Sequence, residues 1–245
     1  MSKIVKICLI VFVTLVMCNE VFASENYYTN NNGVIFTEEE YNFLSKMYWE
    51  GCQDLFTQKD YEDFVNSKII EGEFQTVEAS YSDNLLFQPF GENTAESNSK
   101  IIKISTSCQS NCTVSVTVTW KTIPKTRSYD VIGARFSGNK LIDVDYTKAI
   151  STTKTNSSTD VKKLDNGFGV SVLLPNTGTT FIVNQGYTVT KGGTIYASYQ
   201  HAKRTISLAN SKNYTISKDG YGGVFKFSGT AANVYDAMRG VSLTV

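Results

Sequence analysis

The sequence predicts an α+β protein that is mainly β, in which an N-terminal αα-hairpin packs on an antiparallel, jelly-roll-like β-sandwich. From residue 100 onward, apolar side chains alternate with polar ones, and turn residues recur at roughly ten-residue spacing, which is typical of short antiparallel strands. Before residue 71, apolar residues follow helical spacing behind two N-terminal capping sequences.

Residues 1–23 have the three-part layout of a cleavable secretory signal peptide. Lys3 and Lys6 provide a basic start, residues 7–17 form an apolar run, and Val21-Phe22-Ala23 places small side chains at the cleavage positions. The apolar run is shorter than the about 20 residues that span a bilayer. We therefore expect a secreted, extracellular protein without a stable transmembrane anchor.

Residues 24–99 are predicted to hold a helical hairpin, one strand and a linker. Thr37-Glu38-Glu39-Glu40 is a capping box, and Thr57 and Asp60 have the same three-residue spacing at the start of a second helix. Gly51 lies where a left-handed C-terminal cap ends the first helix. The apolar faces of two short helices cannot bury each other completely, so we expect the hairpin to dock on the rest of the protein. Residues 74–81 are the predicted strand, and the polar residues 91–99 are the predicted linker.

Residues 100–245 are predicted to form the antiparallel β-sandwich domain. Apolar residues alternate with Ser and Thr at Val114, Val116, Val118 and Trp120. This pattern predicts a strand with one buried face and one solvent-exposed face. Glycine- and asparagine-containing pairs separate the later strands, as in tight hairpins. The Ser/Thr-rich residues 149–160 are predicted to be a loop or an edge.

Three cysteines remain when the signal is removed. Cys108 and Cys112 flank the polar turn Gln109-Ser110-Asn111, and we predict a disulfide between them in an oxidising compartment. Cys52 is left over, either as a buried, inert thiol or as a partner in an intermolecular bond. No metal site is predicted, because exported thiols oxidise and the chain has a single histidine.

The composition and the motifs exclude several functional classes. The chain has 23 Lys and Arg against 23 Asp and Glu, and this neutral balance argues against nucleic acid as a partner. No cofactor is predicted, because the glycine-rich runs do not fit phosphate-binding loops. Nothing marks a nucleophile and an acid for a triad around His201. The sequence thus favours a protein that is not an enzyme, without settling the question.

Tyrosine is abundant, with 14 residues in the chain. Exposed aromatic rings stack on sugars or anchor protein partners. The candidate ligand-binding residues in the last third of the chain are Tyr196, Tyr199, His201, Tyr214 and Tyr221. The leading hypothesis is therefore non-enzymatic binding of an extracellular glycan, such as a cell-surface polysaccharide, or of a protein.

Two alternative functions stay open at this point. Asp143 and Asp145 lie two apart in a predicted strand and project from one face, as carboxylates of a secreted hydrolase would. The alternation of Ser or Thr with Val over residues 113–119 is also typical of the strands of membrane-active or pore-forming toxins.

Overall fold

A computed structural model of the protein describes residues 26–80, 99–217, 224–236 and 239–245. The predicted signal peptide, residues 1–23, lies outside the described residues, as does the predicted linker except for its last residue. Within the part of the chain that is described, no helix is long and apolar enough to cross a membrane.

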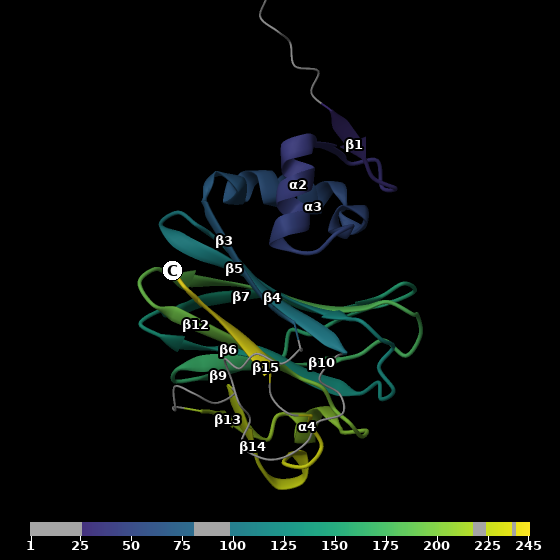
Figure 1. Cartoon of the computed structure of the whole chain (residues 1–245), viewed down its shortest axis with the longest axis vertical. Coiled ribbons are helices and arrows are strands. Elements are labelled where there is room, and N and C mark those ends of the chain that lie inside the picture. The colour runs from purple at the N-terminus through teal and green to yellow at the C-terminus, as the bar shows by residue number, and fades with distance from the viewer. Residues whose placement is uncertain (1–25, 81–98, 218–223, 237–238) are drawn as a thin grey trace, which may run out of the picture.

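Two antiparallel sheets pack face to face, which confirms the predicted fold class (Figure 1). The larger sheet has, in spatial order, β3 (Glu73–Ser80), β4 (Lys100–Cys108), β5 (Asn111–Trp120), β11 (Phe181–Thr190), β7 (Leu141–Ser151) and β8 (Thr155–Ser157). The smaller sheet has β15 (Arg239–Thr244), β12 (Thr194–Gln200), β6 (Tyr129–Ser137), β10 (Gly167–Leu173) and β9 (Val161–Leu164). Within residues 149–160, predicted as a loop or an edge, the short β8 forms the edge of the sheet, whereas residues 149–151 are the buried end of β7.

The main core lies between the two sheets and is built by period-two alternation. The inward-facing residues of β5 are the predicted ones, and Val114, Val116 and Val118 are fully buried. Rings from the facing strands fill the centre, with Phe168 and Tyr187 packed edge to face at 5.1 Å between ring centroids. Burial of apolar area at about 25 cal/mol per Å² makes this layer the main source of stability.

The N-terminal residues fold into a small helical cover. Its elements are β1 (Tyr27–Thr29), β2 (Ile35–Thr37), α2 (Glu38–Met47), η1 (Cys52–Leu55), α3 (Gln58–Ser67) and η2 (Ile69–Glu71). Both predicted capping boxes are present, at Thr37 with Glu40 and at Thr57 with Asp60. Gly51 is left-handed as predicted, with a φ of 81°, but it precedes η1 and does not cap the first helix, since α2 ends at Met47 and its C-cap is Tyr48.

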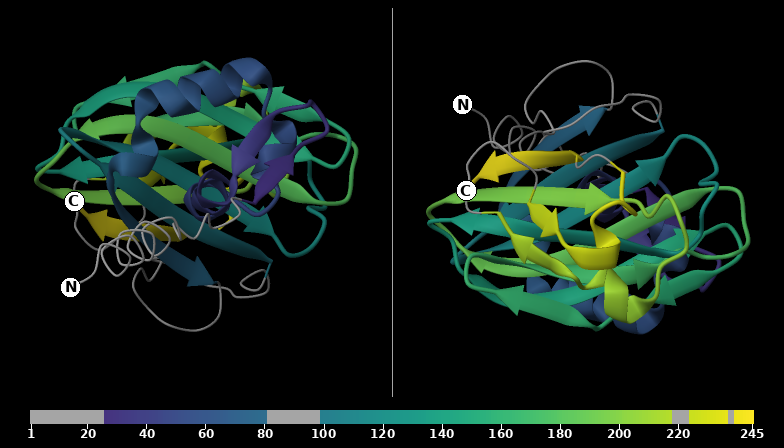
Figure 2. Two further views of the ribbon diagram at one scale, coloured as in Figure 1. Left: turned by 90° about the horizontal axis from the view of Figure 1, so that it is seen from above. Right: turned by 90° about the horizontal axis from the view of Figure 1, so that it is seen from below.

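The helical cover lies across the outer face of the six-stranded sheet (Figure 2). The Thr117 hydroxyl donates to the Tyr48 carbonyl at 3.0 Å, and the Ser105 hydroxyl donates to the Lys46 carbonyl at 3.3 Å. The last carbonyls of a helix have no donors within the helix, and hydroxyl groups of the sheet donate to those at the end of α2. The predicted solvent-exposed face of β5 is therefore covered at its centre, where Thr117 on β5 and Ser105 on the neighbouring β4 bind the end of α2.

The six-stranded sheet begins before residue 100. The predicted strand 74–81, expected to accompany the helices, is β3, which pairs with β4 from Glu73 opposite Cys108 to Ser80 opposite Ile101. This pairing satisfies the outer backbone groups of β4, which would otherwise be an open edge. The strand thus belongs to the sandwich, and the chain leaves and re-enters the same sheet.

A second layer covers the outer face of the five-stranded sheet, seen below it in Figure 1. It comprises α4 (Leu208–Ser211), β13 (Tyr214–Ile216), β14 (Phe225–Phe227) and η3 (Gly229–Ala231). Tyr214 and Phe225 pack here against β10, where a Cβ at Gly169 would lie 2.5 Å from the Tyr214 hydroxyl. Glycine at this position therefore permits the close approach.

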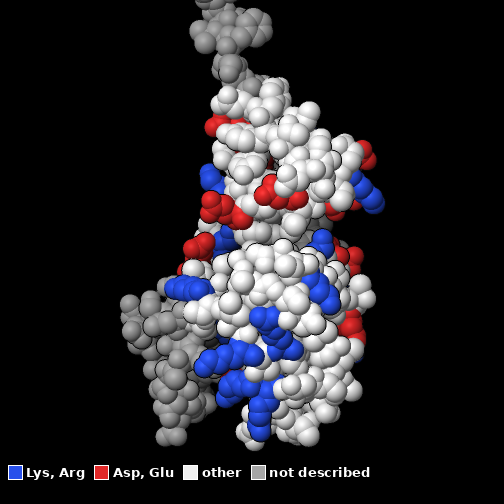
Figure 3. Space-filling view, turned by 90° about the vertical axis from the view of Figure 1, so that its right-hand side faces the viewer, with Lys and Arg blue, Asp and Glu red and all other residues white. Residues whose placement is uncertain are grey.

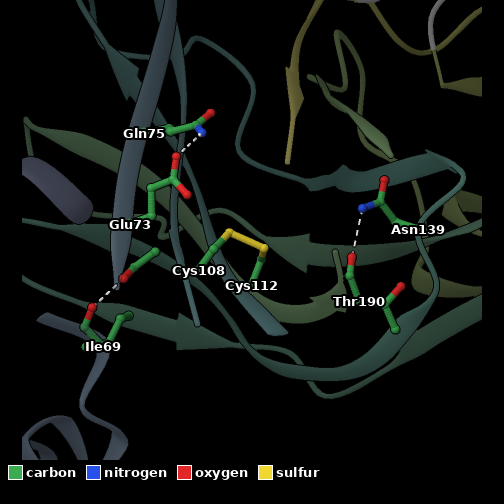
Figure 4. Close-up of a disulfide and its surroundings, with 8 residues drawn as sticks. Ile69, Glu73, Gln75, Cys108, Cys112, Asn139 and Thr190 are labelled. Carbon is green, nitrogen blue, oxygen red and sulfur yellow. Dashed lines mark hydrogen bonds between the residues drawn. A yellow bond between two sulfur atoms is a disulfide. The ribbon is translucent and has the colours of Figure 1, made fainter. Parts of the chain in front are cut away.

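A disulfide joins Cys108 and Cys112, the pair predicted from the sequence (Figure 4). The two residues lie directly opposite each other in the register of β4 and β5, with their Cα atoms 4.1 Å apart. At the same end of the sandwich, the side chain of Asn139, in the turn between β6 and β7, donates to the Thr190 carbonyl of β11 at 2.8 Å. We call this end of the sandwich the disulfide end.

Candidate functional site

Four loops meet at the other end of the sandwich, where β5 finishes and β6 begins. They are residues 121–128, 151–154, 174–180 and 201–206. The Thr126 hydroxyl donates to the Lys203 carbonyl at 3.0 Å, and the Thr153 and Thr177 hydroxyls lie 2.8 Å apart. These bonds link the loops in pairs, and we call the surface that they form the loop end.

The loop end is strongly basic, although the whole chain is neutral. Its Lys and Arg residues are Lys121, Lys125, Arg127, Lys154, Lys203 and Arg204. The four loops contain no Asp or Glu. Figure 3 shows Lys and Arg side chains gathered over this side of the sandwich, while many of the acidic side chains lie around the helical cover. Such segregation creates a local positive potential that net charge does not reveal.

The two arginines of the loop end hold the loops in place. Arg127 lies 4.8 Å from the Phe181 ring centroid and donates to the carbonyl of Asn176. Arg204 donates to the carbonyl of Asn233 at 2.9 Å. The four lysines occupy exposed positions on the same loops. The arginines therefore order a platform, and the lysines carry most of its accessible charge.

A group of ionisable and aromatic side chains fills the interior beneath the loop end, and we call it the buried ionic cluster. Its members are Lys100, Trp120, Asp130, Tyr199, His201 and Asp236. Lys100 is 1% exposed and Asp130 is fully buried. Charges so far from water are costly unless they are paired and hydrogen-bonded.

Lys100 is held between an acid and two rings. Its Nζ atom contacts the Asp236 carboxylate. The same atom lies 4.7 Å from the Trp120 ring centroid and 5.3 Å from that of Tyr199. The aromatic faces stabilise a cation and also exclude water from the Lys100–Asp236 contact.

Asp130 is the acceptor at the centre of the buried ionic cluster. Its carboxylate accepts from the Tyr199 hydroxyl, from the Ala202 amide at 2.8 Å, and faces His201 Nδ1 at 3.0 Å. Burial, followed by the charge of Asp130, raises the pKa of Tyr199 well above its ordinary value. The phenol therefore stays protonated as a donor to Asp130.

Asp236 is fixed by the backbone of His201. The His201 amide donates to Asp236 Oδ1 at 2.8 Å, and the Asp236 amide donates to the His201 carbonyl at 2.9 Å. Burial raises the pKa of Asp236, although the charge of Lys100 opposes the shift. The environment of this carboxyl group thus favours its protonated form more than water does.

Most of the predicted ligand-binding residues are interior. Tyr199 is fully buried and His201 is 5% exposed, so the structure brings these two together in the buried ionic cluster. Tyr214 is 2% exposed in the second layer. Tyr196 is half-buried, and the Arg135 guanidinium lies 4.0 Å from the centroid of its ring. Tyr221 lies outside the described residues. The buried three face core rather than solvent, because their strands and turns are covered on that side.

Asp143 and Asp145, the candidate hydrolase pair, lie on an exposed part of β7. The register between β7 and β11 is interrupted at Asp145, which is the extra residue of a β-bulge. Partial desolvation and then the charge of Asp143 raise the pKa of Asp145. The two carboxylates therefore interact, and the hydrolase alternative stays a prediction.

Cys52 is a buried thiol whose Sγ atom lies 3.4 Å from the Leu44 carbonyl. Burial raises the pKa of Cys52 to about 12, so almost no reactive thiolate is present at neutral pH. We expect residues 24–245 to react negligibly with a thiol-specific chromogenic reagent until denaturant unfolds them, after which one thiol appears. Rapid labelling of the native protein would contradict this placement.

Lys100, Asp130 and Asp236 were not among the residues singled out from the sequence. A signal for two of them exists in the strand period. Lys100 alternates with Ile102 and Ile104, and Asp130 shares the parity of Ile132, so each charge falls on a core-facing position. A charge on the buried face of a strand requires a partner, but the sequence does not say which.

The fold and the site define a two-sheet antiparallel β-sandwich with a helical cover, a basic loop end and an ionic cluster beneath it. No family model and no curated protein matches the chain. A solved structure that matches is the crystal structure of ACE19, the collagen binding subdomain of the Enterococcus faecalis surface protein ACE. That match has a TM-score of 0.25 and 19% sequence identity, and it covers 36% of this chain and 73% of that chain.

Proposed function

We propose that the protein is a secreted, non-enzymatic binding module whose loop end binds an anionic polysaccharide at the cell exterior. The observation that carries this proposal is the basic loop end, in which four adjoining loops hold six cations and no acid. The proposal differs from the sequence-based hypothesis in the kind of contact that the protein makes with its ligand. Ionic contacts from lysines replace stacking by tyrosines, because two of the four candidate tyrosines, Tyr199 and Tyr214, are buried.

The arrangement suits a polymer better than a small anion. Each exposed cation adds only about 0.2–1 kcal/mol, so useful affinity needs several contacts at once. Lysines present point charges on flexible stems, and they tolerate variable spacing between the negative groups of a chain. Arg127 links the loop of residues 121–128 to that of residues 174–180, and Arg204 anchors the loop of residues 201–206 to Asn233, so the positions of the lysines are set before the ligand arrives.

The test is retention of residues 24–245 on dextran sulfate beads, with neutral dextran beads in parallel. Four exposed lysines of the loop end are replaced by glutamine in one variant, at Lys121, Lys125, Lys154 and Lys203. A control variant removes the same charge elsewhere, at the exposed Lys46, Lys140, Lys163 and Lys191. We expect the first variant to bind at least about tenfold more weakly and the control to bind like the wild type.

Three outcomes would overturn the proposal. Equal losses in the two variants would mean that net charge alone controls retention. Retention by neutral dextran would return the aromatic side chains to consideration. Displacement from the beads by double-stranded DNA at concentrations far below those needed of free dextran sulfate would make nucleic acid the better ligand.

A further inference from the structure

The contact between Lys100 and Asp236 joins parts of the protein that are far apart in sequence. The residues are 136 positions apart, and one begins β4 of the larger sheet while the other precedes β15 of the smaller sheet. Their side chains are 1% and 9% exposed. We propose that Lys100 Nζ and Asp236 Cγ are joined by an intramolecular amide, an isopeptide bond, that forms spontaneously after folding.

The reaction is a condensation that needs no added reagent. Within the buried pair, a proton passes from the ammonium group to the carboxylate, which leaves an amine and a carboxylic acid. The Nζ lone pair attacks Cγ, the new N–C bond forms, and the bond from Cγ to one carboxyl oxygen breaks. That oxygen leaves as water with one proton from the acid and one from the amine.

The surroundings supply what such a reaction needs. The His201 amide, 2.8 Å from Asp236 Oδ1, is placed to stabilise the negative charge that develops on this oxygen during attack. Trp120 and Tyr199 pack around Nζ and keep water away from the product. Burial also raises the pKa of Asp236, in the direction that the protonated, electrophilic form requires.

Asp130 acts as a positioning residue for this reaction. It accepts from Tyr199 and faces His201 Nδ1, so it orients one ring beside Lys100 and the residue whose amide holds Asp236. Nothing else in the described parts of the chain couples a lysine this deeply to an acid.

Two physical effects favour the amide over the ion pair. Folding fixes the amine beside the carboxyl group, which replaces a collision in solution by a contact of high effective concentration. Forming the amide also removes two charges from the interior, where the attraction within even a well-oriented ion pair hardly exceeds the cost of desolvating it.

The chain contains a matched contact that should not react. Lys212 Nζ also contacts a carboxylate, that of Asp160, but these side chains are 30% and 44% exposed. Water has access to both of these groups, whereas burial excludes it from the Lys100–Asp236 contact. The Lys212–Asp160 pair therefore separates the effect of contact from the effect of burial.

The test is the intact mass of residues 24–245 after the disulfide is reduced. We expect the folded protein to weigh one water molecule less than its sequence. Protease digestion should yield a branched peptide that contains Lys100 and Asp236, with no cleavage after Lys100. A mass equal to that of the sequence, in protein that is folded by circular dichroism, would overturn the proposal.

Variants give the result a second, independent readout. Lys100→Met should restore the full sequence mass, whereas Lys212→Met should still lose one water. Asp236→Asn should expel ammonia instead of water, so its product should have the same mass as the wild-type product although the starting chains differ. Loss of water that persists in Lys100→Met would place the bond elsewhere and refute the assignment.

Discussion

Replacing Lys100 with methionine should lower the midpoint of thermal unfolding by about 10–20 °C. A cross-link from Lys100 to Asp236 closes a loop of more than 100 residues, and this constraint on the unfolded chain is worth roughly 4–5 kcal/mol. For a protein of this size, each kcal/mol shifts the midpoint by about 2–4 °C. Scanning calorimetry of the wild type and the variant, each with the Cys108–Cys112 disulfide intact and reduced, measures the shift.

The matched control is the double variant Lys100→Met with Asp236→Leu. Replacing both partners of a buried ion pair by apolar residues is often neutral or stabilising, because no charge is left unpaired. An amide gives the opposite expectation, since the double variant also loses the covalent link. A double variant that melts at or above the wild-type midpoint would therefore contradict the cross-link, whereas one that melts far below it supports the bond.

Replacing Asp130 with alanine should destabilise the protein by about 3–5 kcal/mol. The change leaves the Tyr199 hydroxyl and the Ala202 amide without their acceptor in a fully buried place. A buried donor that loses its partner costs about 1–3 kcal/mol, and loss of a buried charge that balances others adds to this. Urea unfolding followed by tryptophan fluorescence reports the change, because Trp120 lies beside the buried ionic cluster.

Asp165 provides the comparison for this experiment. It is an exposed acid, and its replacement removes the same charge as that of Asp130. Asp165→Ala should therefore change stability by no more than about 0.5 kcal/mol. If Asp130→Ala behaves like Asp165→Ala, the buried ionic cluster contributes little to the fold and its proposed role in positioning His201 is wrong.

The features that the sequence predicts well are those that depend on near neighbours. The capping boxes at Thr37 and Thr57 act over three residues, and both form. The disulfide spans a turn of three residues and depends only on a hairpin between its cysteines. The alternation along β5 identifies its buried face because the period of a strand is fixed by backbone geometry.

The features that the sequence did not predict depend on which surfaces meet. The polar faces of β4 and β5 resemble solvated faces. Only the docked helix, with its carbonyls at Lys46 and Tyr48, shows that Ser105 on β4 and Thr117 on β5 have partners. The tyrosines were candidates for a ligand surface because composition cannot distinguish an exposed ring from a covered one. Tyr214 is covered by packing that only the tertiary fold creates.

The candidate site was hidden for a related reason. The six cations of the loop end are scattered over residues 121–204, and a neutral total conceals them. They become one surface only because antiparallel strands return each loop to the same end of the sandwich. Charge segregation of this kind follows from topology, and it could have been anticipated only with the order of the strands.

The measurement that tests the central claim most directly is the salt dependence of binding to dextran sulfate. Contacts between exposed charges weaken as salt screens them, so we predict that residues 24–245 lose most of their affinity between about 50 mM and 200 mM salt. We also predict no binding to neutral dextran at either concentration. Affinity that is unchanged across this range, or equal for the charged and the neutral polymer, would contradict a binding function based on the basic loop end.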